Sequence, residues 1–100
     1  EVNVNIKDNA GETPLINACY KGNVEAAKIL INNGAIIDDK NNNSFTGLFI
    51  AAHYGYYDIV KLLLENGANP NTKNNMEFTP LLFAHDEKTK ALLRKYGATE

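Results

Sequence analysis

The chain repeats itself at a fixed interval. A Thr-x-Leu segment begins at Thr13, Thr46 and Thr79, so each copy starts at the same distance after the one before it (46 − 13 = 33 and 79 − 46 = 33). A unit of this length cannot bury its own apolar face and becomes stable only when it stacks on neighbouring units. The repeat therefore predicts a solenoid, which offers an extended surface for contacts and has no pocket built into it.

Each of these threonines precedes an apolar-periodic run and is expected to cap the start of a helix. Pro14 and Pro80 support this prediction, because proline is favoured at the first helical position. Gly47 stands at that place in the second copy. A flexible glycine is expected to loosen the helix start, so the sequence predicts that Gly47→Pro raises the melting temperature.

A second amphipathic stretch follows in two copies, at residues 24–33 and 57–66, after a glycine that interrupts the first run. Another glycine follows each stretch, where a left-handed helix end is favoured. Each unit is therefore expected to contain two antiparallel helices. The residues of the second helices that are predicted to face inward are Ile29, Leu30, Leu62 and Leu63.

Segments rich in Asn, Asp and Lys join the units, at residues 37–44 and 70–77. They are predicted to form hairpin-like turns that project from the helices, and we call these projections fingers. Two interpretations of their asparagines remain open. One is ordinary turn chemistry, and the other is adaptable hydrogen bonding to a partner at the finger tips.

The last copy is shorter than the others. Gly97-Ala98 follows Gly67-Ala68 at a reduced interval (97 − 67 = 30, compared with the repeat of 33), so three residues are missing between the helices of this copy. We expect a single domain over residues 1–100, and we expect that it is the C-terminal piece of a longer protein and ends near a natural terminus. Its expected parts are the end of a preceding repeat at 1–7, repeats at 8–40 and 41–73, and a shortened, charged C-terminal capping repeat at 74–100.

The chain resembles the ankyrin repeat family over essentially its whole length. The resemblance is carried by the Thr-Pro-Leu segments, the paired alanines, the turn glycines, the Leu-rich stretches and the Gly-Ala pairs, all in one register. It implies an all-α solenoid of stacked helix–turn–helix units with projecting β-hairpin-like fingers. One departure concerns the family's histidine after Thr-Pro-Leu, which is replaced by the apolar residues Ile16, Phe49 and Leu82. Apolar packing should then replace its hydrogen bonds.

Charge and hydropathy argue against several classes of partner. The net charge is −2 with the two signs interspersed, so no basic stripe indicates nucleic acid and no polycationic segment indicates a membrane. No apolar run approaches the roughly 20 residues of a membrane span. We expect a cytoplasmic protein without a cofactor, monomeric in isolation, whose partner is another protein.

The chain offers little for catalysis. His53 and His85 should project from the first helices of adjacent repeats, but a metal site with Asp86 or Glu87 would lack a fixed third ligand. Cys19, the single cysteine, stands in the paired-alanine site and is expected to be buried and inert. These observations predict that the protein is not an enzyme.

Aromatic residues mark a candidate binding surface on the concave side, which the fingers and first helices line. Phe45 and Phe78 occupy the same repeat position, so stacking should set them side by side. They are either binding residues or local packing on their own fingers. Other positions are those that usually face the partner in ankyrin-like proteins. The candidate partner-binding residues are Asn9, Glu12, Tyr20, Lys21, Asn43, Phe45, His53, Tyr54, Met76 and Phe78.

The sequence thus predicts a non-catalytic scaffold or adaptor that binds a protein through its concave surface. Two alternatives remain open. The chain could be a regulatory or inhibitory domain of a longer enzyme or effector whose N-terminal part is absent here, or a purely structural repeat stack. The resemblance implies contact with a protein but does not name it.

Overall fold

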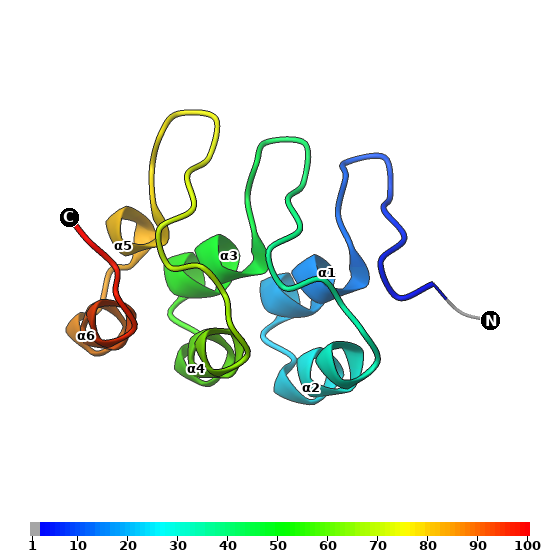
Figure 1. The fold of residues 1–100 in the computed structure, drawn as a ribbon, viewed down its shortest axis with the longest axis horizontal. Coiled ribbons are helices and arrows are strands. Elements are labelled where there is room, and N and C mark those ends of the chain that lie inside the picture. The colour runs from blue at the N-terminus through cyan, green and yellow to red at the C-terminus, as the bar shows by residue number, and fades with distance from the viewer. Residues whose placement is uncertain (1–2) are drawn as a thin grey trace.

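The computed structural model describes residues 3–100 (Figure 1); Glu1 and Val2, at the start of the expected preceding repeat, lie outside the described residues. Helices are the regular secondary structure of this part of the chain, and no strand occurs within it. The helices are α1 (Pro14–Lys21), α2 (Val24–Asn32), α3 (Gly47–Tyr54), α4 (Tyr57–Glu65), α5 (Pro80–Phe83) and α6 (Glu87–Lys95).

The helices form two layers in an elongated stack of 40 × 27 × 20 Å. Helices α1, α3 and α5 lie in one layer and α2, α4 and α6 in the other, while the loops before α1, α3 and α5 project away from both (Figure 1). Each helix packs on its pair and on its equivalent in the next unit. The core lies between the layers, where Leu15, Leu48, Leu63 and Leu93 are almost completely buried. The predicted stack of helix pairs is confirmed.

The predicted threonine caps are confirmed at two of three positions. The hydroxyl of Thr13 accepts a hydrogen bond from the backbone N–H of Ile16 at 3.2 Å, and that of Thr46 accepts one from Phe49 at 3.4 Å. Thr79 makes no such bond, and within residues 3–100 its buried hydroxyl has no hydrogen-bond partner. The helix that Thr79 precedes is a single turn of four residues.

The three missing residues of the last copy shorten its first helix. Helix α5 has four residues, compared with eight in α1 and α3, whereas the second helices all have nine. Ala84 ends α5 in an extended conformation. His85 therefore lies in the connection after the helix, and the expectation that it projects from a first helix is wrong.

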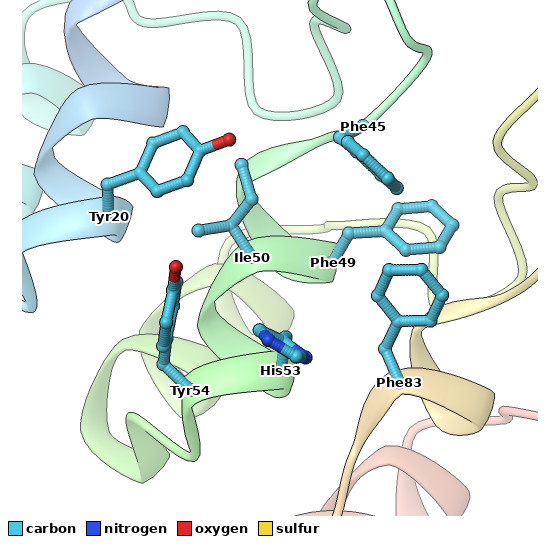
Figure 2. Close-up of a pocket in the computed structure, with 7 residues that line it drawn as sticks. All are labelled: Tyr20, Phe45, Phe49, Ile50, His53, Tyr54 and Phe83. Atoms are coloured by element: carbon cyan, nitrogen blue, oxygen red, sulfur yellow. The ribbon is translucent and has the colours of Figure 1, made fainter.

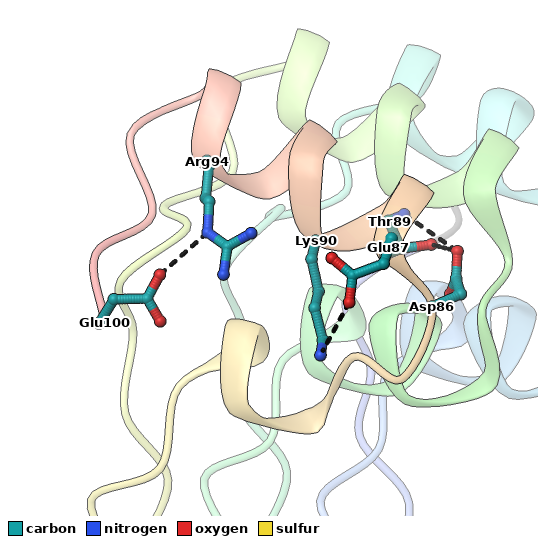
Figure 3. Close-up of polar contacts among 6 residues, drawn as sticks. All are labelled: Asp86, Glu87, Thr89, Lys90, Arg94 and Glu100. Atoms are coloured by element: carbon teal, nitrogen blue, oxygen red, sulfur yellow. Dashed lines mark hydrogen bonds and ion pairs between the residues drawn. The ribbon is translucent and has the colours of Figure 1, made fainter.

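Helix α6 lies at the end of the described stack and carries charged side chains on its surface. One carboxylate oxygen of Asp86 caps the helix by accepting hydrogen bonds from the N–H of Thr89 at 3.0 Å and from its hydroxyl at 2.9 Å (Figure 3). The hydrogen bond from that N–H holds the pKa of Asp86 below its ordinary value. Arg94 and Glu100 form an ion pair at 2.9 Å at the end of the chain.

The fingers are hydrogen-bonded loops without strands in the described chain, so they resemble hairpins only in outline. One side chain closes each tip: Asn41 Oδ1 accepts from the N–H groups of Asn43 and Phe45 at 2.9 and 3.0 Å. Asn74, one repeat later, makes the same two bonds to Met76 and Phe78. The asparagines at these two positions therefore serve turn chemistry.

One packing prediction is wrong, and one packing contact was not foreseen. Ile29 was expected to face inward, but 61% of its surface is exposed, whereas Leu30 and Leu62 are half-buried and Leu63 is completely buried. Gly47 was expected to loosen the start of α3. It is buried instead, and a Cβ atom at this position would collide with the sulfur of Cys19.

Candidate functional site

An apolar pocket of about 230 Å³ lies where the first helices meet the base of the fingers (Figure 2). Most of its wall comes from α3, and single residues come from α1, from α5 and from the loop before α3. The prediction of a surface with no built-in pocket is therefore wrong. The lining residues are Tyr20, Phe45, Phe49, Ile50, His53, Tyr54 and Phe83.

Phe83 holds one side of the pocket together. Its ring lies 5.6 Å from that of Phe45 and 5.4 Å from that of Phe49, the second pair being edge-to-face. The ring of Phe78 lies 6.1 Å away on the next finger. Aromatic pairs at these distances and tilts attract one another beyond the area that they bury. Phe45 and Phe78 are thus linked through Phe83.

The two candidate phenylalanines differ in exposure. Phe45 is half-buried, and its ring also packs against Phe49 at 5.5 Å, so it is part of the wall. Phe78 is 39% exposed, and Met76 on the same finger is 69% exposed. The packing alternative thus applies to Phe45, although its ring contacts the first helices rather than its own finger.

Tyrosines form the opposite side of the pocket. The rings of Tyr20 and Tyr54 lie 6.3 Å apart, and Tyr54 stacks on Tyr56 at 5.6 Å. Tyr54 remains 51% exposed. Partial burial raises the pKa of Tyr20 above its ordinary value, and the nearby carboxylate of Glu12 raises it further. The phenol of Tyr20 therefore stays neutral at physiological pH and can donate a hydrogen bond at the edge of the pocket.

Cys19, His53 and His85 are the side chains that were considered for reactivity from the sequence. Burial raises the pKa of the Cys19 thiol to about 12, so the thiol stays protonated and unreactive, as expected. Nε2 of His85 lies 3.3 Å from Nδ1 of His53, which confirms that the two histidines are neighbours. No group of three or more His, Cys, Asp or Glu side chains suited to a metal occurs in residues 3–100.

Comparison with known families agrees with this architecture. The family model described as ankyrin repeats, in three copies, matches residues 1–74 and again residues 46–99. The chain belongs to the ankyrin repeat family. Ankyrin repeats are in general protein–protein interaction modules and are typically non-catalytic. No curated protein sequence matches the chain significantly.

Within residues 3–100, no helix of this ankyrin stack combines the length and the apolar character needed to cross a bilayer. The longest helices have nine residues, whereas a transmembrane helix needs about 20.

The ankyrin fold brings some of the candidate binding residues together and separates others. Tyr20, Phe45, His53 and Tyr54 line the pocket, and Phe78 touches its wall through Phe83. The remaining candidates lie outside the pocket, on the fingers or at the end of α1. They are Asn9, Glu12, Lys21, Asn43 and Met76.

Three lining residues were not among the candidates. Phe49 had been assigned to packing between repeats, and it does fill the wall. Ile50 and Phe83 are one repeat apart and occupy the same position of the ankyrin unit, which Asn17 occupies in the first copy. Reading this position along the repeats would have revealed both, because equivalent residues of stacked units lie side by side.

Proposed function

We propose that this ankyrin-repeat chain is a non-catalytic scaffold or adaptor that binds a protein partner through its finger–helix surface. We define this surface as the seven residues lining the pocket together with Met76 and Phe78. The single observation that carries the proposal is the aromatic pocket with its exposed edge. Tyr, Phe and Met side chains are enriched in the cores of protein interfaces, and Tyr is also enriched at hot spots.

The size of the pocket favours a side chain of a protein over a separate small molecule. At about 230 Å³ it falls below the range of about 300–1,000 Å³ that is usual for small-molecule sites. Its lining is mostly aromatic and includes no carboxylate or lysine. A large apolar side chain of the partner would therefore fill it, and the tyrosine hydroxyls would bond to the partner's backbone.

Charge supports a protein partner rather than nucleic acid or a membrane surface. The net charge of −2 gives no electrostatic attraction to phosphates. We further propose that the chain acts as a monomer in the cytoplasm. A single cysteine, buried and not paired in a disulfide, is compatible with a reducing compartment.

We also propose that the repeats run over residues 8–40, 41–73 and 74–100, after the end of a preceding repeat at 1–7. The backbone supports this register. Gly11, Ser44 and Glu77 occupy one position in successive units and all adopt a left-handed conformation, with φ of 77°, 64° and 67°. Asp8, Asn41 and Asn74 close the three finger tips at the same spacing.

Affinity capture from the source cell's lysate tests the binding proposal. The unmodified chain is compared with a Met76→Glu/Phe78→Glu double variant, which places two charges on the finger–helix surface without touching the core. Ile29→Glu is the matched control, because it also changes an exposed apolar residue but lies on α2, in the other helix layer. Melting curves establish that all three proteins are folded.

We expect a partner to be retained by the unmodified chain and by Ile29→Glu, and lost by the double variant. Equal capture by all three proteins would place the binding surface elsewhere. If the unmodified chain captures nothing, the two alternatives gain support: a regulatory or inhibitory role within a longer enzyme or effector, or a purely structural stack.

A further inference from the structure

We propose that His53 and His85 together bind a divalent transition-metal ion of the zinc type at the edge of the aromatic pocket. The two rings come from successive units: His53 lies in the last turn of α3, and His85 follows α5. Nε2 of His85 and Nδ1 of His53 are 3.3 Å apart, close enough for one ring to donate a hydrogen bond to the other. This inference is independent of the protein partner proposed above.

The separation of the two nitrogens suits a shared metal ion. Zinc–nitrogen bonds are about 2.0–2.1 Å long, so two imidazole nitrogens in a tetrahedral site are about 3.3–3.4 Å apart. The observed 3.3 Å matches this edge of the tetrahedron. The ion would lie beside the line that joins the two nitrogens, and it would replace the present hydrogen bond, with both rings turned so that their lone pairs point at it.

Surrounding aromatic rings help to position His53. Its ring meets Tyr54 edge-to-face at 4.9 Å and Phe83 at 6.0 Å, and Figure 2 shows it between these two side chains. The ring of His85 lies 5.2 Å away. Both histidines are exposed, so an ion can reach them from solvent.

The shortened helix α5 explains why the second imidazole is available. His85 stands one repeat after Ala52, which is completely buried on α3. If α5 continued for a second turn, residue 85 would turn into the stack as Ala52 does. Because α5 ends at Phe83, His85 is exposed beside His53.

The neighbouring carboxylates have other partners. Asp86 accepts two hydrogen bonds from Thr89 at the start of α6, and Glu87 pairs with Lys90 at 3.6 Å. We therefore assign two protein ligands to the ion. Its other two positions would be filled by water or by a group from another molecule, one more than in zinc sites that have three protein ligands and a single open position.

Zinc titration of the full chain without a histidine tag tests the proposal. Binding is followed by calorimetry and by amide NMR shifts at near-neutral pH, with Mg²⁺ as a hard-ion control that prefers oxygen ligands. The test variants are His53→Asn and His85→Asn, each removing one exposed imidazole. Glu87→Gln is the matched control, because it removes an exposed carboxylate from the same region.

We expect one zinc ion per chain, with amide shifts centred on residues 53 and 85 and no response to Mg²⁺. Each histidine variant should lose about tenfold or more in affinity, since removing a ligand costs at least as much as disturbing its supporting shell. Glu87→Gln should bind like the unmodified chain.

Three results would overturn the proposal. These are no binding at millimolar zinc, equal binding by either histidine variant and the unmodified chain, or a loss in Glu87→Gln as large as in the histidine variants. The last result would indicate a carboxylate site. Melting curves without zinc show whether each variant is folded. The loss of zinc affinity must appear in both His53→Asn and His85→Asn.

Discussion

Gly47 packs directly against the sulfur of Cys19: a Cβ atom at residue 47 would lie 2.8 Å from Sγ. One repeat later, the equivalent positions hold Ala52 and Pro80. The larger Cys19 on α1 thus faces a glycine at the start of α3. The smaller Ala52 on α3 is paired in the same way with Pro80 at the start of α5. Closely packed interiors require this kind of compensation, because an added atom forces its neighbours to move.

We predict that Gly47→Pro destabilises the protein by about 1–3 kcal/mol, the usual cost of overpacking. This reverses the expectation from sequence. In a Cys19→Ala background, where the sulfur is gone, the same substitution should cost much less. A double-mutant cycle followed by urea unfolding measures the coupling. Additive effects would show that the contact is not the cause.

We predict that Glu77→Gly stabilises the protein by about 0.5–1 kcal/mol. Glu77 has a φ of 67° at the finger position where the first unit has Gly11, and a left-handed conformation is costly for any residue with a Cβ atom. The ion pair that Glu77 would lose, with Lys73 at 3.6 Å, is exposed and contributes little. Urea unfolding provides the measurement.

Gly11→Ala is the control for this prediction, because it makes the reverse kind of change at the same finger position. A Cβ atom at Gly11 would approach the backbone nitrogen of Asn42 to 2.8 Å, so this substitution should destabilise the protein. If Glu77→Gly also destabilises it, the side chain of Glu77 contributes more than its backbone conformation costs.

A repeated polar contact links successive units near the glycines that follow the second helices. The side-chain amide of Asn5 donates to the carbonyl of Gly34 at 3.1 Å, and that of Asn71 donates to Gly97 at 2.9 Å. Asp38 occupies this position in the middle unit. Its carboxylate accepts a hydrogen bond from a backbone N–H, as the side chains of the two asparagines do. An ionised carboxylate has no proton, however, so it cannot donate the second hydrogen bond that the asparagines donate to a glycine carbonyl.

Burial raises the pKa of the Asp38 carboxyl above its ordinary value, although the hydrogen bond from Asn69 and the charge of Lys40 act in the opposite direction. The folded protein therefore binds this proton more tightly than the unfolded chain does. The resulting stability is present below the unfolded pKa and is lost as the pH rises through the folded pKa.

We predict that Asp38→Asn raises the free energy of unfolding by about 1 kcal/mol at near-neutral pH, through a new hydrogen bond to Gly67 and the loss of a half-buried charge. The gain should shrink towards about pH 3, where the carboxyl of the unmodified protein is neutral and can donate. Unfolding experiments at several pH values measure it. A gain that does not vary with pH would exclude the titration of Asp38 as its cause.

We predict that Leu63→Ala destabilises the protein by about 2–5 kcal/mol, because it deletes a completely buried side chain between the two helix layers. Ile29→Ala is the matched comparison. It removes an aliphatic side chain of the same size from a second helix, but at an exposed site, so the effect should stay within about 0.5 kcal/mol. Similar losses from both changes would contradict the assigned packing.

Much of the fold could be predicted because the same local signals occur three times. Thr13 and Thr46 marked helix starts that the structure confirms, since a side-chain cap depends on residues only three positions apart. Thr79 carries the same signal, but its helix lacks the second turn and the cap does not form. Here the number of residues available between the helices outweighed the local preference.

The candidate site was predicted in part. Tyr20, His53 and Tyr54 were identified from repeat positions, and all three line the pocket. Phe83 was missed, although its ring joins Phe45 to the next finger. Its repeat position, shared with Ile50, places it at the pocket, but the contacts of its ring with Phe45 and Phe78 depend on how the two units stack.

The sequence by itself determined the repeat, its helix pairs and the family, because these depend on short-range patterns that recur at a fixed interval. Only the tertiary structure decided which apolar residues are buried, why Gly47 is required beside Cys19, and that His53 and His85 meet. These relationships arise between units, where the distance between two atoms depends on how whole helices stack and on where α5 ends.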